Sequence, residues 1–261
     1  MNQTLLQITG LNIGVQGLEA YTPLIKGVDL NIEELQIVAL VGGSGSGKTT
    51  LGLSILKLLP EAMSVIDGKI FFNGKNILEF SNAQMRRLRG KEISMVFQEP
   101  LSAFNPVFTV GSQIDEVLRF HTPLNRQKRR GKVWQLLETV GIPDPKRVAN
   151  QYPHQLSGGM RQRAMIAQAV SAGPKLIIAD EPTSNLDVTL QALVIELFRK
   201  LRDELKISLL LITHDLGVVS ELADNVAILF DGRIVESGRA REIFENPRHP
   251  FTSELVNAVM A

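Results

Sequence analysis

The stretch from Val41 to Thr50 reads VGGSGSGKTT, and its glycines leave a run of backbone amides uncovered by side chains. An apolar run precedes it and an apolar helical pattern follows it, so it is expected to join a buried strand to a helix. Uncovered amides at the positive end of a helix form a concave site for anionic oxygens. A flexible Gly/Ser linker is the alternative, but a linker is not expected between a buried strand and an apolar helix. The stretch therefore predicts a phosphate-binding loop.

Four residues of this stretch fit the Walker A pattern GxxxxGK[ST]: Gly42, Gly47, Lys48 and Thr49. The pattern predicts that the Lys48 ammonium binds the β- and γ-phosphates of a nucleoside triphosphate and that the Thr49 hydroxyl is a ligand of Mg²⁺. The pattern therefore predicts a nucleoside triphosphate and Mg²⁺ as cofactors. The full set of residues predicted to bind nucleotide here is Gly42, Gly43, Ser44, Gly45, Ser46, Gly47, Lys48, Thr49 and Thr50.

Hydrolysis of a bound nucleotide needs a further carboxylate for Mg²⁺ and a group that activates water. The segment LIIADEP ends an apolar run with two adjacent acids, Asp180 and Glu181. We interpret Asp180 as the Walker B carboxylate that holds Mg²⁺ and Glu181 as the catalytic residue that orients or deprotonates the attacking water. Taken alone, the two acids are equally typical of a cap for the following helix. The glycine loop upstream favours catalysis.

The elements that must position these groups alternate between strands and helices. Residues 5–13 and 24–32 alternate apolar and polar side chains, which predicts antiparallel strands, whereas 36–41 is almost wholly apolar and predicts a buried parallel strand. A helix is expected from Lys48 to Pro60, and GKIFFNG predicts a short strand that ends in a turn. The further apolar segments 175–180, 207–213 and 225–230 predict strands, and 110–120, 126–141, 159–173 and 189–205 predict helices. This alternation favours a parallel α/β sheet with an inserted helical region.

Composition excludes several classes of protein and site. The chain has 261 residues, 44% hydrophobic content, 28 basic against 27 acidic residues and no cysteine. Disulfides, thiolate metal sites and cysteine-bound iron–sulfur clusters are therefore excluded, and nothing requires nucleic acid as a partner. The basic run RQKRRGK at 126–132 favours a solvated helix face, with a nucleic-acid or membrane patch as the alternative. The N-terminus lacks the features of a signal peptide and no apolar run reaches the roughly 18 residues of a membrane span, so we expect a cytoplasmic protein.

A second glycine-containing helix start lies shortly before the two acids. The segment LSGGM at 156–160 offers the Ser157 hydroxyl and the bare amides of Gly158 and Gly159 at the start of a helix, which is a second potential anion site. With the motifs above, it resembles the LSGGQ signature of ATP-binding subunits of ABC transporters. The resemblance implies that Ser157, Gly158 and Gly159 act on the ATP bound by a partner subunit. Met160 stands where most members have glutamine, which puts a polar role of that position in doubt.

The remaining motifs of this family occur in the expected order. Gln98 in MVFQEP resembles the Q-loop glutamine, which implies contact with Mg²⁺ and with the attacking water. SNLD at 184–187 resembles the D-loop, and His214 in LLLITHD resembles the switch histidine that contacts the γ-phosphate. Tyr21 is the nearest aromatic residue for stacking on adenine, although the resemblance places that position nearer Glu19. An ordinary strand-turn tyrosine is the alternative interpretation of Tyr21.

The resemblance extends over nearly the whole chain and implies a fold and a division. It implies an α/β P-loop NTPase core of RecA-like type with a mainly parallel sheet, an N-terminal antiparallel β subdomain and an inserted α-helical subdomain. The core is expected at 1–101 and 173–245, the helical subdomain with the signature at 102–172, and the start of a C-terminal extension at 246–261.

Further segments, among them IFENPRHPFTSELVNA, resemble the peptide and nickel import branch of the family. This implies an ATPase at the cytoplasmic face of the membrane that powers uptake of peptides, nickel or metal chelates. Its implied partners are a second ATPase subunit, unlike or identical, two transmembrane permeases and, indirectly, a solute-binding protein. Gly43 stands where peptide members often have glutamate, and peptide members tend to continue well beyond the HPFTSEL element, so both features favour an importer of nickel or a metal chelate. Closure of two subunits around ATP is implied to move the permeases.

Other classes of ATPase fit less well. A soluble ABC ATPase of DNA repair or translation, or an exporter ATPase, shares the core motifs. Repair members insert a long coiled coil and translation members carry two cassettes, and this chain has room for neither. A GTPase would need an Asn-Lys-x-Asp motif, which is absent from the sequence. A catalytically dead subunit is disfavoured because Glu181 and His214 are both present.

Overall fold

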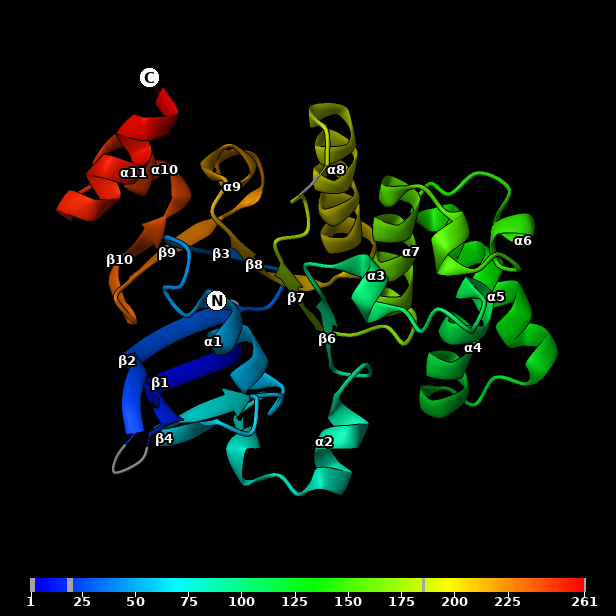
Figure 1. Ribbon diagram of the computed structural model, residues 1–261, viewed down its shortest axis with the longest axis horizontal. Coiled ribbons are helices and arrows are strands. Elements are labelled where there is room, and N and C mark those ends of the chain that lie inside the picture. Colours follow the sequence, from blue (N-terminus) through cyan, green and yellow to red (C-terminus); the bar gives the residue numbers. More distant parts are fainter. Residues whose placement is uncertain (1–2, 18–20, 185, 261) are drawn as a thin grey trace. The chain divides into compact units, whose positions relative to one another are not determined.

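The computed structural model describes residues 3–17, 21–184 and 186–260 (Figure 1). The chain forms two compact units, of which the first comprises Met1–Arg86 with Ser208–Ala261 and the second Arg87–Ile207. The expected helical subdomain, 102–172, lies wholly within the second unit, together with strand and helix segments on both sides of it. The division expected from the sequence stays a prediction.

An antiparallel sheet forms one part of the first unit. Its strands, in the order β2-β1-β4-β5, are β2 (Tyr21–Glu33), β1 (Thr4–Gln16), β4 (Met63–Phe72) and β5 (Lys75–Asn76). β1 pairs antiparallel with both β2 and β4, and its side chains are buried in the alternating manner expected of a sheet with one covered face. The two antiparallel strands predicted for the N-terminal part are confirmed.

Parallel strands form the other part of the first unit. They are β3 (Ile37–Val41), β8 (Ser208–Thr213) and β9 (Asn225–Phe230), and β10 (Arg233–Arg239) adds an antiparallel edge next to β9. All five residues of β3 and all six of β8 are buried, as their continuous apolar sequences predict for strands that are covered on both faces. The three predicted strands are confirmed.

The helices of the first unit include one that is shorter than predicted. They are α1 (Lys48–Ile55), α9 (Leu216–Leu222), α10 (Ala240–Glu245) and α11 (Pro250–Met260), with a 3₁₀ turn η1 (Ile77–Glu79). The sequence predicted that α1 continues to Pro60, which is wrong, because Lys57 adopts a left-handed φ of 50°. The Leu58 amide then donates to the Leu53 carbonyl and the Lys57 amide to the Ser54 carbonyl, so the helix ends in a Schellman motif.

The second unit combines one pair of parallel strands with most of the helices (Figure 1, green to yellow). β6 (Ile93–Val96) and β7 (Leu176–Asp180) are parallel neighbours with every residue buried. The helical elements are α3 (Pro100–Ala103), α4 (Val110–His121), α5 (Arg126–Thr139), α6 (Pro145–Val148), η2 (Pro153–Gln155), α7 (Gly158–Val170) and α8 (Val188–Leu205), and α2 (Asn82–Leu88) contains the boundary between the units. The four helices that the sequence predicted after residue 100 are confirmed.

Lys206 directly follows the last residue of α8. It adopts a left-handed conformation with φ 59° and ψ 41°, a region in which glycine is much less strained than a residue with a Cβ atom. Lys206→Gly is therefore expected to raise the free energy of unfolding by about 0.5–1 kcal/mol. Chemical denaturation monitored by circular dichroism measures this. Lys206→Gln is the control for the lost charge and should show no gain; an equal gain in both variants would contradict the explanation from backbone strain.

No helix in the described ranges has the length and apolar character that are needed to cross a bilayer.

Candidate functional site

The predicted phosphate-binding loop lies between β3 and α1 in the first unit, as the sequence predicted. The loop is held in a turn by the Ser46 amide, which donates to the Gly43 carbonyl, and by the Leu51 amide, which donates to the Gly47 carbonyl. Gly47 occupies the N-cap position of α1 and has no side chain with which to cap this helix end. The loop thus leads directly into the positive end of a helix, which favours an anion.

Two glycines of the loop are required for different reasons. A Cβ atom on Gly42 would lie 2.2 Å from the Leu229 carbonyl oxygen, which belongs to the backbone of β9 and cannot move aside as a side chain can. Gly47 has a φ of 102°, a backbone conformation that strains any residue with a Cβ atom, and the nearest atom to such a Cβ would be Cδ1 of Ile25 in β2 at 2.6 Å. A Cβ atom on Gly43 would meet nothing within 4 Å.

The polar side chains of the loop are arranged around its centre. Lys48 is 8% exposed, and its Nζ donates to the carbonyl oxygens of Gly42 at 2.8 Å and Gly43 at 2.9 Å. The Ser46 hydroxyl oxygen is buried and has no hydrogen-bond partner in the part of the chain that the structure describes. A buried polar group without a partner is costly unless a ligand or water satisfies it. The glycine at the N-terminus of α1, the other glycines of the loop and this hydroxyl therefore fit a phosphate chain.

His214 lies at the same sheet edge as the loop. β3 and β8 are parallel, with Val41 paired to Thr213, so Gly42 and His214 follow neighbouring strands at their carboxyl ends. His214 is exposed, and the next residue, Asp215, caps α9 by accepting from the amides of Gly217 and Val218. The structure therefore brings the predicted switch histidine to the edge that carries the phosphate-binding loop.

Tyr21 lies at the start of β2, the strand whose Ile25 packs against Gly47. Tyr21 precedes Ile25 by four residue positions, which correspond to about 13 Å in a strand. Tyr21 is 46% exposed, so its ring is accessible for stacking. The alternative position, Glu19, lies outside the described residues, as does Asn185 of the predicted D-loop.

A second group of predicted residues lies at the edge of the parallel pair in the second unit. Val96 of β6 is paired with Ala179 of β7, so Asp180, the last residue of β7, and Gln98, two residues after β6, lie at neighbouring strand ends. Asp180 is 3% exposed, whereas Gln98 is exposed. The carboxyl ends of parallel strands are the usual location of ligand sites in α/β proteins. This edge therefore carries both residues that the sequence assigned to the metal besides Thr49.

Glu181 has a backbone conformation that its residue type disfavours. Its φ is +47°, in the left-handed region, and the residue is 9% exposed. The Glu181 carbonyl accepts from both the amide and the hydroxyl of Ser184, at 3.1 Å and 2.8 Å, which fixes the turn after β7. Strained backbone at a non-glycine residue is concentrated at functional sites. The conformation is an independent reason to single out the residue that the sequence assigned to catalysis.

The predicted signature segment forms the start of α7. The Ser157 hydroxyl accepts from the Met160 amide at 3.3 Å and so caps the helix. Ser157 and Gly158 are exposed, whereas Gly159 is buried, and a Cβ atom on it would lie 3.0 Å from Leu190 of α8. The absence of a side chain at Gly159 therefore serves close packing as well as access to the backbone.

Gln162 is a residue of this region that the sequence analysis missed. It is buried on α7, and its Nε2 donates to the Pro182 carbonyl at 2.7 Å. This bond ties the signature helix to the loop that carries Glu181. The signal that could have found it is a glutamine on the apolar face of a helix, between Gly159 and Ile166.

Replacement of Gln162 tests this link. Gln162→Leu is expected to lower the free energy of unfolding by about 1–3 kcal/mol, because the buried Pro182 carbonyl loses its donor. We expect the ATPase rate to fall as well, since the position of Glu181 is no longer fixed through Pro182. Gln168→Leu is the matched control on the same helix. If both variants behave alike, Gln162 has no specific role.

Comparison with known proteins gives the family of the chain. The family model described as ABC transporter matches residues 25–184. The chain belongs to the ABC transporter family. As a member it is an ATP-binding ATPase with an α/β P-loop NTPase fold.

Two relatives within the ABC transporter family have peptide transport in their names. The chain is 46% identical to a putative peptide import ATP-binding protein of Brucella ovis, over 98% of this chain and 78% of that protein. It is 45% identical to the oligopeptide transport ATP-binding protein OppD of Bacillus subtilis, over 97% of this chain and 71% of that protein.

Solved structures of ABC cassettes have the same fold. A dimeric, post-hydrolysis state of the ATP-binding cassette MJ0796, bound to ADP and Pi, is 27% identical with a TM-score of 0.81 and covers 91% of this chain and 99% of that one. The cbiO1 protein of Clostridium perfringens, part of the ABC transporter complex cbiONQ, is 28% identical with a TM-score of 0.80, and covers 94% of this chain and 92% of its own.

Proposed function

We propose that this chain is the ATPase subunit of an importer that takes up peptides through separate membrane subunits. The observation that carries the proposal is the similarity to peptide import ATP-binding proteins along almost the whole chain. The geometry of the phosphate-binding loop supports it, since Gly42 is packed too closely to carry a side chain and Gly47, with its positive φ, leads into the N-terminus of α1.

The side chains of the loop would hold the triphosphate. In this proposal Lys48 releases the Gly42 and Gly43 carbonyls and binds the β- and γ-phosphates, while the amides from Gly43 to Thr50 surround the phosphate oxygens. Tyr21 stacks on the adenine. An exposed ring at the end of the strand that contacts Gly47 supports this role.

Magnesium would be held by Thr49, Gln98 and Asp180 together with the phosphates, and when bound it neutralises charge that develops during phosphoryl transfer. Hydroxyl, amide and carboxylate oxygens are the donors that Mg²⁺ prefers. In the described part of the chain no group of three or more His, Asp or Glu side chains is placed to hold a metal. This agrees with a metal ion that binds chiefly through its nucleotide.

Glu181 would orient the attacking water and accept its proton, and His214 would contact the γ-phosphate. Gln98 would approach the same water. The burial of Glu181 beside Asp180, on a strained turn that Ser184 holds, supports a fixed position for the carboxylate. A general base requires such a fixed position.

The partners in this proposal are a second ATPase subunit, two permeases and, indirectly, a solute-binding protein. Ser157, Gly158 and Gly159 would act on the ATP of the second ATPase subunit, which is either unlike this chain or a second copy. The dimeric cassette among the similar structures supports pairing. ATP must bind the closed pair more tightly than the open pair, because only such a difference moves the equilibrium. The subunit would then work at the cytoplasmic face of the membrane.

The phosphate-binding loop alone does not indicate which cargo is transported. Gly43 favoured nickel or a metal chelate in the sequence analysis, whereas the relatives named above are peptide importers. We therefore place peptides first. Neither the preference from Gly43 nor the preference from these relatives involves a residue that contacts the cargo.

Uptake assays test the proposal. Deletion of the gene is expected to abolish uptake of a radiolabelled peptide and to leave ⁶³Ni uptake unchanged, and the intact gene should restore uptake. A gene that carries Glu181→Gln should not. Loss of nickel uptake alone would overturn the peptide assignment, and unchanged uptake of both would overturn the importer assignment.

A further inference from the structure

The two-residue turn between β9 and β10, formed by Asp231 and Gly232, lies against β2, a strand that is distant from it in the sequence. The Lys26 amide of β2 donates to the Gly232 carbonyl at 2.8 Å. A Cβ atom on Gly232 would overlap the Leu24 carbonyl oxygen, so the two backbones meet with no room for a side chain. Asp231 has a φ of 46° and Gly232 one of 74°, as tight hairpin turns require. The turn therefore fits closely against the backbone of β2.

β2 is irregular at the residue that meets this turn. In the pairing of β2 with β1, Lys26 and Gly27 lie opposite the single residue Asn12, which forms a β-bulge. The Asn12 side chain accepts from the Gly27 amide at 2.9 Å, whereas the Lys26 amide donates to Gly232. Bulges are frequent next to functional sites, where they redirect the chain. The bulge thus supplies the donor that binds the turn.

An ion pair joins the same two segments. The Nζ atom of Lys26 lies 2.8 Å from Oδ2 of Asp231, whose side chain is 74% exposed. Exposed pairs of this kind contribute little to stability by themselves. The close approach of the two backbones is therefore the stronger link between the turn and β2.

The strands that the turn connects also contact the phosphate-binding loop. β9 meets the start of the loop, where the Leu229 carbonyl leaves no room for a Cβ atom on Gly42. β2 meets the end of the loop, where the fully buried Ile25 lies against Gly47. Each end of the loop thus packs against one strand, and the turn holds the two strands together. A displacement of the turn would reach Gly47, the residue directly before Lys48.

From these contacts we propose that the Asp231–Gly232 turn positions the phosphate-binding loop for ATP. The turn holds β2 in place, and Ile25 of β2 then fixes Gly47. Gly232 is a positioning residue, since it acts on the loop through β2. The loop would hold the phosphates both before and during hydrolysis, so a displaced turn should raise KM and leave kcat nearly unchanged. The proposal rests on ATP binding by this loop, which is part of the function proposed above.

Gly232→Ala tests the proposal, and Gly74 offers a closely matched control. Both glycines are the second residue of a two-residue hairpin turn, with φ values of 74° and 73°. A Cβ atom on Gly74 would meet nothing within 4 Å. Alanine is therefore equally strained by the backbone at the two positions, but only Gly232→Ala must displace its turn from a neighbouring strand.

We expect Gly232→Ala to weaken ATP binding at least about tenfold and Gly74→Ala to leave it within about twofold, because small displacements of binding groups have large effects. Equilibrium dialysis of labelled ATP with the full-length chain measures affinity, and chemical denaturation measures whether each variant is folded. Phosphate release by the chain assembled with its partners gives KM and kcat. In Gly232→Ala, KM should rise in proportion to the dissociation constant, and kcat should change by less than about twofold.

A second pair of variants decides the question if Gly232→Ala does not fold. Ile25→Val and Ile13→Val each remove one buried methyl group from two residues that face each other on β2 and β1. Of the two, Ile25 is the residue whose Cδ1 atom lies next to Gly47. Ile25→Val is expected to weaken ATP binding about threefold through the lost packing contact, and Ile13→Val should leave it unchanged.

Several outcomes would overturn the proposal. Equal weakening of ATP binding in Gly232→Ala and Gly74→Ala would assign the effect to backbone strain alone. Unchanged ATP affinity in a folded Gly232→Ala, a fall in kcat with unchanged KM, or equal effects of the two valine variants would also contradict it.

Lys48→Ala separates this proposal from the function proposed above. Full ATP binding in Lys48→Ala would contradict both, because the loop would then not be the nucleotide site. Loss of ATP binding in Lys48→Ala together with unchanged binding in Gly232→Ala would contradict only the role of the turn.

Discussion

Replacing Glu181 by glutamine is expected to reduce the steady-state ATPase rate by about 10²–10⁴-fold while ATP still binds with little change in affinity. Glutamine keeps the size and the left-handed backbone position but cannot accept the proton of the attacking water. Phosphate release by the chain assembled with its partners measures turnover, and retention of labelled ATP on the same assembly measures binding.

Two further variants separate chemistry from folding. Glu204→Gln removes an exposed carboxylate at the end of α8 and should leave the rate unchanged. Glu181→Gly should be as inactive as Glu181→Gln, yet at least as stable as the original protein, since glycine relieves the φ of +47°. Undiminished phosphate release in Glu181→Gln would remove this residue from the catalytic site.

Gly42→Ala is expected to disrupt the phosphate-binding loop. The added Cβ atom would lie 2.2 Å from a backbone oxygen of Leu229, and neither the loop nor β9 can yield by moving a side chain. We expect a loss of at least about 1–3 kcal/mol in the free energy of unfolding, as overpacking in a rigid region causes. We also expect ATP affinity to fall at least tenfold.

Gly43→Ala is the matched control for this experiment. It adds the same methyl group one residue further along, where nothing lies within 4 Å and φ is not positive. Thermal denaturation and equilibrium binding of ATP are measured for both variants. If Gly43→Ala is as damaging as Gly42→Ala, the close approach of Leu229 is not the reason for the glycine.

Sequence patterns predicted most of the fold because the apolar periods are clear. The mostly apolar segments form β3, β7, β8 and β9, and the alternating segments form β1 and β2. The end of α1 was not predictable from propensity, since Leu58 and Leu59 continue the apolar pattern and only the conformation of Lys57 ends the helix.

The sequence predicted which residues form the candidate site, and the structure shows which strands and hydrogen bonds position them. Strand order places His214 beside the loop that follows β3, and Gln98 beside Asp180. The link from Gln162 to Pro182 and the strained turn at Glu181 depend on tertiary packing, so no local pattern encodes them. The roles of these residues in ATP hydrolysis stay predictions until the variants are measured.

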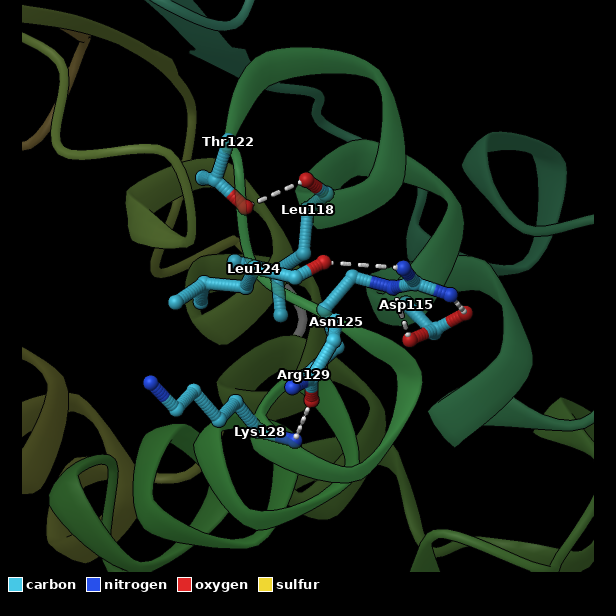
Figure 2. A network of polar contacts seen from close by, with 7 residues as sticks. All are labelled: Asp115, Leu118, Thr122, Leu124, Asn125, Lys128 and Arg129. Carbon is cyan, nitrogen blue, oxygen red and sulfur yellow. Dashed lines mark hydrogen bonds and ion pairs between the residues drawn. The ribbon is translucent and has the colours of Figure 1, made fainter.

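The basic residues of the run 126–132 have different surroundings in the structure, although their charges are alike. The sequence favoured a solvated face throughout. Arg129 is instead half-buried in its pair with Asp115 (Figure 2), whereas the guanidinium carbon of Arg130 lies 5.1 Å from the centre of the Trp134 ring. Successive residues of a helix point in different directions because its period is about 3.6 residues. Basic residues of one run therefore contact different parts of the protein, and the composition of the run does not reveal this.

The hydrogen bonds of Lys48 to the Gly42 and Gly43 carbonyls bear on the thermodynamics of nucleotide binding. When a nucleotide binds, the ammonium would exchange these two hydrogen bonds for new ones to the phosphates. The measured enthalpy of binding should therefore be smaller than a count of phosphate contacts suggests. These two bonds order the loop before a nucleotide enters, so we expect little conformational entropy of the loop to be lost at binding.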